Sequence, residues 1–276
     1  MPRPTALRSY FFRRHSRAAG ATVLALLACT VAGCASYAAP GPGANLAMIT
    51  GEDRQSLTDP NVQVAMDRKP LAKFPAAVAV VRVQAPRYRS LTASSYGSGA
   101  FSVVTTRDVE PDGTVERLAK LPQVSGVAPI GRLLLPPTFH SDKELRHAAA
   151  QLNADMLLVY TLDTSFYVRD MAKPLSVVSL GLSPNKQARV VTTASAVLMD
   201  TRNGYVYGMA EATDTYNRLA SGWTSDDAID AARLKTEATA FEKLVGNLET
   251  TWKTVVARYA PPGGATPAAA AEPATR

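Results

Sequence analysis

The feature that most limits the fold of this chain is a helix placed between two apolar segments of strand length. Ser141 and Glu144 form a capping box, which starts a helix that ends near Leu152. An apolar strand region at 124–135 precedes it, and a buried strand at 156–162 follows it. Because only a few residues join the three elements, we expect an α/β layer with a right-handed crossover.

Further strands and a long helix complete the expected fold. The apolar, β-branched run 77–83 predicts a buried strand. Asn203-Gly204 is a strong turn signal, so the segments around it are expected to pair as an antiparallel meander. A stripe of apolar residues at helical spacing extends to Tyr259. We therefore expect a mixed α/β (α+β) sheet with a meander in its second half, packed by helices that include a long C-terminal one. The predicted meander strands are 175–182, 189–200 and 205–213, and the predicted helix starts at Thr224 or Asp227.

Residues 1–33 have the three parts of a signal peptide. A stretch with five arginines and no acidic residue is followed by an apolar run of about 14 residues, 18–31, and then by small residues. The run is shorter than the ~20 residues that span a bilayer as a helix. We interpret it as the core of an export signal. Arg13-Arg14 leaves twin-arginine export open as an alternative route.

The end of the leader resembles the lipobox of bacterial lipoproteins. Val31, Ala32 and Gly33 stand immediately before Cys34. The resemblance implies cleavage before Cys34, acylation of its sulfur and new amine, and a membrane contact made through this lipid anchor. Ala35, in place of Asp, implies the outer membrane rather than the inner one. The alternative is an ordinary secreted protein with a chance cysteine at this position.

Removal of the leader changes what the composition implies about disulfide bonds and about nucleic-acid binding. Cys29 leaves with it, so the mature chain has no cysteine pair for a disulfide. The chain carries a formal charge of +7, but five of its 30 basic residues lie in the leader, which leaves 25 against 23 acidic residues. A nucleic-acid partner is therefore not expected.

The mature chain divides into three regions. We expect an acylated N-terminus and tether at 34–72, an α/β periplasmic domain at 73–259 and a disordered Pro/Ala-rich tail at 260–276. Within the tether, residues 59–68 fit either a short helix that starts at Asp59-Pro60 or a disordered spacer.

Two stretches of the domain resemble small periplasmic lipoprotein domains. In 145–160 a helix ends in Leu-Asn-Ala-Asp and enters a buried strand, and in 194–207 a strand ends in Asp200, followed by a Gly-containing turn and a return strand. The pattern is similar to the curli-secretion lipoprotein, the lipoprotein activators of penicillin-binding proteins and the TolB amino-terminal domain. Rhombosortase-associated lipoproteins are similar in this order of helix, strands and turn. The resemblance implies an α/β sandwich that binds envelope proteins and has no active site.

The residues themselves predict no catalytic residues, cofactor or metal site. His140 and His147 are the only histidines after the leader, and His140 precedes the helix cap. Gly97-Ser98-Gly99 lacks the context of a nucleophile elbow. Asp200 is expected to organise its turn, and Asp155 is expected to link helix to strand.

Two Arg- and Tyr-rich groups are the candidate binding residues, because such side chains are favoured at interfaces. The alternative is that they belong to ordinary solvated loops. These candidates are Arg87, Tyr88, Arg89 and Tyr96 in one loop, with Tyr167 and Arg169 as the second group.

The sequence therefore favours a non-enzymatic lipoprotein, anchored in the outer membrane and facing the periplasm, that binds an envelope protein. The alternative is an envelope lipoprotein that binds a small molecule or a lipid. A large apolar cavity would favour the alternative, whereas a solid core with an exposed Arg and Tyr patch would favour a protein partner. The sequence leaves the oligomeric state open.

Overall fold

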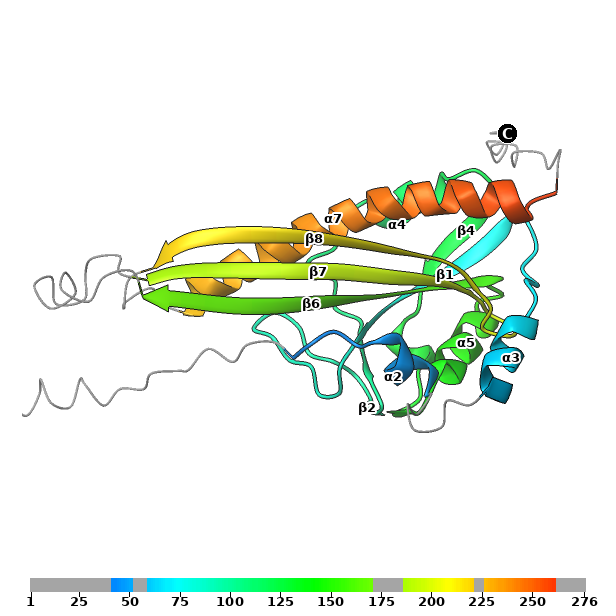
Figure 1. The fold of residues 1–276 in the computed structure, drawn as a ribbon, viewed down its shortest axis with the longest axis horizontal. Coiled ribbons are helices and arrows are strands. Elements are labelled where there is room, and N and C mark those ends of the chain that lie inside the picture. Colours follow the sequence, from blue (N-terminus) through cyan, green and yellow to red (C-terminus); the bar gives the residue numbers. More distant parts are fainter. Residues whose placement is uncertain (1–40, 52–58, 171–185, 221–225, 262–276) are drawn as a thin grey trace, which may run out of the picture. The chain divides into compact units, whose positions relative to one another are not determined.

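The computed structural model describes residues 41–51, 59–170, 186–220 and 226–261 (Figure 1). In these ranges a six-stranded mixed sheet has the order β3-β1-β6-β7-β8, with β4 also paired to β1, and β2 and β5 form a separate pair. The strands are β1 (Ala76–Gln84), β2 (Ser98–Gly99), β3 (Ser102–Val104), β4 (Val124–Pro129), β5 (Thr138–Phe139), β6 (Met156–Asp170), β7 (Lys186–Asp200) and β8 (Val206–Ala220). The helices are α2 (Leu46–Thr50), α3 (Asp59–Asp67), α4 (Thr114–Ala119), η2 (Arg132–Leu134), α5 (Asp142–Gln151) and α7 (Asp226–Tyr259). The predicted mixed sheet and long C-terminal helix are confirmed.

Helix α5 connects two strands that run parallel to β1. Ala79 of β1 pairs with Ala128 of β4 on one side and with Leu157 of β6 on the other. The predicted capping box is present: the Ser141 hydroxyl accepts from the Lys143 amide at 3.3 Å, and the Glu144 carboxylate accepts from the Ser141 amide at 3.1 Å. The cap fixes where the helix begins, and four residues separate the end of the helix from the start of β6.

The meander strands are longer than the sequence predicts. Strand β6 continues eight residues past the predicted end at Leu162, to Asp170, and β8 continues from the predicted end at Thr213 to Ala220. These extensions are rich in polar residues, so the search for apolar patterns in the sequence did not detect them. They are held by ladder pairing and by buried threonines: the hydroxyls of Thr164 and Thr192 lie 3.0 Å apart. The predicted strand 175–182 and most of the turn 183–186 lie outside the described residues.

Asp200 organises the β7–β8 turn, as predicted. Its Oδ1 accepts from the Arg202 amide at 2.8 Å, and its Oδ2 accepts from the Tyr207 hydroxyl and the Leu71 amide, each at 2.8 Å. The Asp155 carboxylate accepts from the Ala77 amide of β1 and from Arg202 of the β7–β8 turn, so it joins the N-terminal end of β1 to this turn rather than linking helix to strand as predicted. Both acids are structural.

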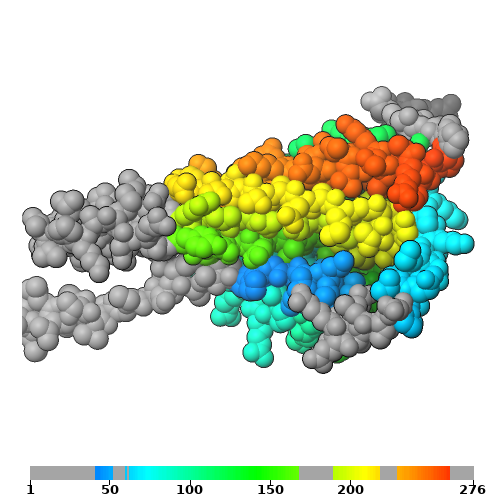
Figure 2. All heavy atoms as spheres, viewed as in Figure 1, coloured from blue at the N-terminus to red at the C-terminus, as the bar shows by residue number. Residues whose placement is uncertain are grey.

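The two faces of the sheet bury separate apolar clusters. Successive strand residues point to opposite faces, so Leu158 packs toward α4 and α7, whereas its neighbour Leu157 packs toward α5 and α2. Figure 2 shows α7 and β8 side by side on one surface, with residues 41–51 on the other side of β8. Each face of the sheet is therefore covered by its own helices.

Residues 41–51 and 69–72 belong to the folded body, which corrects the predicted boundary at 73. Ala44 and Ile49 are buried in the cluster beneath α5, and the Ala44 amide donates to the Thr161 hydroxyl at 3.0 Å. The Ala72 amide donates to the Tyr207 hydroxyl at 2.9 Å. Between the two segments, helix α3 confirms the helical alternative for 59–68. The predicted tail from 262 on lies outside the described residues.

Candidate functional site

A cavity of about 290 Å³ lies between the sheet, α4, α7 and the loop that follows β3. We call it the α4–α7 cavity. Strands β1 and β6 form its floor, and residues of α4 and of two turns of α7 form its sides. Its lining is polar and apolar in about equal parts, and the apolar part includes Val80, Leu118, Leu158, Val245 and Leu248. These side chains come from four elements that meet only in the folded chain.

One end of the cavity is polar. Oε1 of Glu110 accepts a hydrogen bond from the Tyr160 hydroxyl at 2.7 Å and lies 3.5 Å from Nη1 of Arg82. Oε2 accepts from the Val109 amide at 3.3 Å. Arg107 lines the same end but is exposed to solvent. The cavity thus combines apolar side chains with convergent polar groups, as small-molecule sites do, although its polar share is large.

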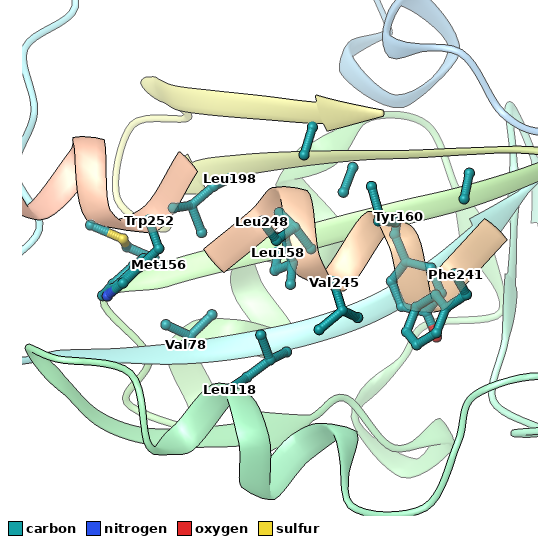
Figure 3. Close-up of a cluster of buried hydrophobic side chains, with 14 of the residues drawn as sticks. Val78, Leu118, Met156, Leu158, Tyr160, Leu198, Phe241, Val245, Leu248 and Trp252 are labelled. Carbon is teal, nitrogen blue, oxygen red and sulfur yellow. The ribbon is translucent and has the colours of Figure 1, made fainter. Parts of the chain in front are cut away.

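The apolar walls continue beyond the cavity toward Trp252. A second hollow of about 30 Å³ shares Leu118, Leu158 and Leu248 with the first. In Figure 3, Tyr160 lies at one end of this row of side chains and Trp252 at the other. The indole N–H of Trp252 donates to the Pro122 carbonyl at 2.7 Å, which holds the ring at the far end.

Behind the polar end lies a buried ionic network. Arg82 and Arg233 are 2% and 0% exposed. Nη1 of Arg82 lies 2.9 Å from Asp108, and Nη1 of Arg233 lies 2.6 Å from Glu237. The side chains of all four acids are at most 8% exposed. The network consists of Arg82, Asp108, Glu110, Asp230, Arg233 and Glu237.

Helix α7 brings half of this network to the sheet. Asp230, Arg233 and Glu237 lie at i, i+3 and i+7, on one face of the helix. Oε1 of Glu237 accepts from the Thr164 hydroxyl at 2.8 Å, which ties the helix to the polar extension of β6. The Thr92 hydroxyl contacts both Asp108 and Arg233, so the loop after β1 is tied to the same network.

Burial sets the protonation behaviour of these groups. Burial raises the pKa of Glu237 above its ordinary value, although the guanidinium groups of Arg233 and Arg82 oppose the rise. Burial, together with the negative charge of Glu110, raises the pKa of Tyr160 well above its usual range. Burial also opposes the charge on Arg82, but nearby acids led by Glu110 outweigh it and keep the pKa of Arg82 raised. Arg82 therefore stays charged, and the Tyr160 hydroxyl stays a donor.

The structure corrects the predicted Arg and Tyr patch. Tyr88 is 3% exposed, and its hydroxyl accepts from Nη2 of Arg82 at 3.2 Å, so it is part of the interior. Tyr96 is half-buried beneath Arg132, whose guanidinium carbon lies 4.3 Å from the ring centre. Only Arg87 and Arg89 of this loop group are exposed. Tyr88 packs inward, where it supplies one of the hydrogen-bond acceptors that the buried Arg82 requires.

The remaining predicted residues do not join this site. Tyr167 lies on β6 and is 60% exposed. Arg169 follows on the same strand, but its side chain lies outside the described part, as do Cys34 and the lipobox residues 31–33. The structure therefore brings none of the predicted binding residues into the cavity.

The residues that do form the polar end carried a signal in the sequence. Arg82 is the one charged residue in the apolar run 77–83, so a buried strand there requires a buried partner for it. On the C-terminal helix, Asp230, Arg233 and Glu237 share a face that is otherwise apolar. Sequence alone could not show that the two groups meet, because 151 positions separate Arg82 from Arg233.

No family model matches the chain, and no curated protein does. Three solved structures resemble it in part. A Caulobacter crescentus CB15 protein described as a lipoprotein is 19% identical, with a TM-score of 0.23, over 37% of this chain and 68% of its own. A Xanthomonas campestris protein of the DUF330 family is 14% identical, with a TM-score of 0.31, over 68% of this chain and 91% of its own. A Helicobacter pylori protein described as a homolog of neuraminyllactose-binding hemagglutinin is 9% identical, with a TM-score of 0.33, over 68% of this chain and 94% of its own.

With TM-scores below 0.5, these likenesses carry no argument about function. None of the three is described as a curli-secretion lipoprotein, an activator of penicillin-binding proteins or a TolB domain, so that resemblance stays a prediction. Among the helices of the described residues, none combines the length and apolar character needed to cross a membrane.

Proposed function

We propose that this protein is an acylated lipoprotein of the bacterial envelope whose domain binds a small amphipathic molecule in the α4–α7 cavity. In this proposal Cys34 carries the lipid, and Val31, Ala32 and Gly33 direct cleavage of the leader. The domain acts in the periplasm at the outer membrane, and it binds its ligand without catalysing a reaction. The observation that carries the proposal is the cavity, whose lining places apolar side chains beside polar ones.

The size of the cavity limits the ligand. Small-molecule pockets span roughly 300–1,000 Å³, and the α4–α7 cavity, at about 290 Å³, lies at the lower end of that range. A single alkyl chain or one ring system fits this volume, whereas a folded peptide does not. Of the two functions that the sequence left open, the cavity supports ligand binding, and the burial of Tyr88 weakens the surface patch that a protein partner would use.

The test is a titration with the uncharged fluorescent probe N-phenyl-1-naphthylamine. It uses the chain from residue 34 on with Cys34→Ser, which needs no detergent; its described residues contain two complete apolar clusters. We expect saturable binding of one probe per chain. Val80→Phe, which places a ring in the cavity, should abolish it.

The matched control is Val62→Phe on the exposed side of α3, where Val62 is 53% exposed. It should bind the probe as the parent does. Equal binding by the Val80→Phe and parent chains, with thermal unfolding showing both folded, would contradict the proposal.

The lipid anchor has a separate test. Globomycin, which blocks the lipoprotein signal peptidase, should leave the precursor uncleaved, and Cys34→Ala should leave it unlipidated and mislocalised. A Cys34→Ala chain that is still processed normally and stays membrane-bound would refute the anchor. Sucrose-gradient separation of the two membranes tests the outer-membrane location.

A protein partner is the second candidate, favoured by exposed apolar side chains. Leu133 is fully exposed beside a groove of about 600 Å³ that continues along α5 past Lys143 and His147. Photo-crosslinkers placed at Leu133 and at Tyr167 should each give one discrete adduct in living cells if these surfaces bind a partner. Placement at the exposed Met66 of α3, which is 76% exposed, is the control and should give none.

A further inference from the structure

We infer that the ligand of the α4–α7 cavity is an uncharged molecule whose polar group both accepts and donates hydrogen bonds, as a carboxamide or a hydroxyl does. The group accepts from Nε of Arg82 and donates to the carboxylate of Glu110. This inference rests on the proposed function and names the chemistry of the ligand. Two features of the described residues carry it: an unpaired buried donor in the cavity wall, and an acid beside it with a free acceptor site.

The unpaired donor is the Nε–H of Arg82, a buried side chain that lines the cavity. Both terminal nitrogens of Arg82 have partners: Nη1 donates to Asp108 at 2.9 Å, and Nη2 donates to the Tyr88 hydroxyl at 3.2 Å. Nε has no hydrogen-bond partner in the part of the chain that the structure describes. Buried donors are nearly always paired with protein, water or ligand. An occupant of the cavity can therefore supply the acceptor that Nε requires.

The second buried arginine shows that this fold can satisfy such a donor. Nε of Arg233 donates to Asp230 at 2.8 Å, Nη1 donates to Glu237 at 2.6 Å and Nη2 donates to the Thr92 hydroxyl at 2.8 Å. Arg233 does not line the cavity. Of the two buried arginines, only Arg82, which borders the cavity, is left with a nitrogen that has no acceptor among the described residues.

Glu110 supplies an acceptor beside this donor. Within the described residues its carboxylate accepts from the Tyr160 hydroxyl at 2.7 Å, from the Val109 amide at 3.3 Å and from Nη1 of Arg82 at 3.5 Å. A carboxylate has about four acceptor sites, so Glu110 can accept one more hydrogen bond. Nη1 and Nε of Arg82 belong to one planar guanidinium, which places Nε close to Glu110. One polar group in the cavity can therefore contact both residues.

A charged group of either sign fits this pair of side chains poorly. An ammonium group has no acceptor, so it would leave Nε of Arg82 unsatisfied. A carboxylate would accept from Nε, but it has no proton to donate to Glu110, and two carboxylates side by side repel each other. An uncharged carboxamide or hydroxyl offers an acceptor and a donor together, and it brings no charge into the interior.

The strands beneath the cavity place the apolar part of the ligand. Alternate residues of a strand point to the same face, so Val80 lies beside Arg82 on the floor of the cavity, and Leu158 lies beside Tyr160. Val80 and Leu158 are also partners in the pairing of β1 with β6. A ligand whose polar group lies at Arg82 and Glu110 therefore rests its apolar part on Val80 and Leu158.

The test compares ligands that share a pentyl chain and differ in the polar group: hexanamide, 2-heptanone, hexanoate, hexylamine and 1-hexanol. Each displaces N-phenyl-1-naphthylamine from the Cys34→Ser chain at pH 7. We expect hexanamide to bind about tenfold tighter than 2-heptanone, because the ketone accepts from Arg82 but cannot donate to Glu110. Hexanoate and hexylamine should bind more weakly than the ketone.

1-Hexanol separates the two forms of the polar group. We expect it also to bind more tightly than 2-heptanone, because its hydroxyl both accepts and donates. The tighter binder of 1-hexanol and hexanamide identifies the group that the site prefers. Hexanoate, hexylamine or 2-heptanone binding as tightly as both of them would overturn the inference.

Glu110→Gln keeps an acceptor for the Tyr160 hydroxyl but replaces the carboxylate by a weaker, uncharged acceptor. It should reduce hexanamide affinity about fivefold and change 2-heptanone affinity less than about twofold, because only the amide donates to this residue. Glu116→Gln, an exposed acid of α4 that lines the same cavity, is the matched control and should change both affinities less than about twofold. An amide preference that is unchanged in Glu110→Gln, with thermal unfolding showing the variant folded, would overturn the inference.

Nuclear magnetic resonance of the arginine Nε–H groups reports the other contact without any substitution at the site. When hexanamide saturates the nitrogen-15-labelled Cys34→Ser chain, the Nε–H proton signal of Arg82 should move downfield, because the group gains an acceptor. The signal of Arg233 is the control and should keep its position, since its Nε already donates to Asp230. An Arg82 signal that does not move at saturation would contradict the inference.

The failure of the inference and the failure of the proposed function give different results. If the fluorescent probe binds but hexanamide and 1-hexanol show no preference over the other three ligands, the inference is refuted and the proposed function stands. If neither the probe nor any of the five ligands binds, the cavity holds water only and the proposed function itself is refuted.

Discussion

The two faces of the sheet are packed differently against the helices that cover them. Under α5, an apolar cluster fills the interior, and its fully buried members include Phe101, Phe139 and Leu145. Under α7, apolar residues pack around Trp252, but the other half of the helix rests on the buried ionic network and the cavity. The hollow found under α2 on the first face is about 50 Å³, against about 290 Å³ under α7. We infer that the α5 face stabilises the domain and that the α7 face gives up packing to leave room for a ligand.

The largest expected loss of stability comes from breaking the buried ionic network. Arg233→Ala should lower the free energy of unfolding by about 3–5 kcal/mol, because it leaves Asp230 and Glu237 buried without their closest counter-charge. Lys243→Ala breaks a pair with Asp214 in which Lys243 is half-exposed, and it should cost about 1 kcal/mol or less. Urea unfolding of both variants measures the difference. Equal costs would mean that the network contributes no more than a surface pair.

A second prediction compares leucines on the two faces. Leu145→Ala, beneath α5, should cost about 4–5 kcal/mol, near the upper end for such truncations. Leu248→Ala, whose side chain already borders the cavity, should cost about 2–3 kcal/mol because fewer contacts are lost. Urea unfolding measures both. The opposite order would show that the α7 face is the better packed of the two.

The pH dependence of stability tests the direction of the pKa shift of Glu237. Its pKa is raised in the folded state, so the folded chain binds this proton more tightly than the unfolded chain does. The contribution of Glu237 to stability is therefore largest below its unfolded pKa of about 4.3, and it decreases as the pH rises toward the folded pKa. The difference in unfolding free energy between the parent and Glu237→Gln should decrease with pH by at most about 1.4 kcal/mol per unit. A difference that increases between pH 4.5 and pH 7 would contradict the assigned direction.

The smallest effects are expected for the tyrosines. Tyr88→Phe removes a hydroxyl that accepts from Arg82 and should cost about 1 kcal/mol. Tyr167→Ser, on the exposed part of β6, should change stability by no more than about 0.5 kcal/mol. Thermal unfolding monitored by circular dichroism measures both. A Tyr167→Ser chain that is clearly destabilised would mean that this tyrosine is covered in the folded protein.

The sequence predicted the parts of the fold that depend on local patterns. The capping box at Ser141 and Glu144, the buried strand at 156–162 and the turn at Asp200 all rest on neighbouring residues, and all three are confirmed. The polar half of β6 was missed because Thr164 is buried through a hydrogen bond to Glu237, 73 positions away. A periodic pattern of apolar residues contains no such information.

The site was not predicted, for a related reason. Arg and Tyr near each other in a loop resemble an interface, but the same residues satisfy a buried arginine when that loop folds inward, as Tyr88 does with Arg82. The lone Arg82 in an apolar strand was the available signal. It indicates that a buried counter-charge exists, but it does not indicate where the counter-charge lies or that a cavity adjoins it.

The most direct test of the central claim is to identify what the protein holds in its own membrane. The lipidated chain and its Val80→Phe variant are purified from envelopes, and their bound small molecules are extracted and identified by mass spectrometry. Our account predicts about one small amphipathic molecule per parent chain, and none in the variant. The same molecules at the same amounts in both proteins would contradict a ligand in the α4–α7 cavity.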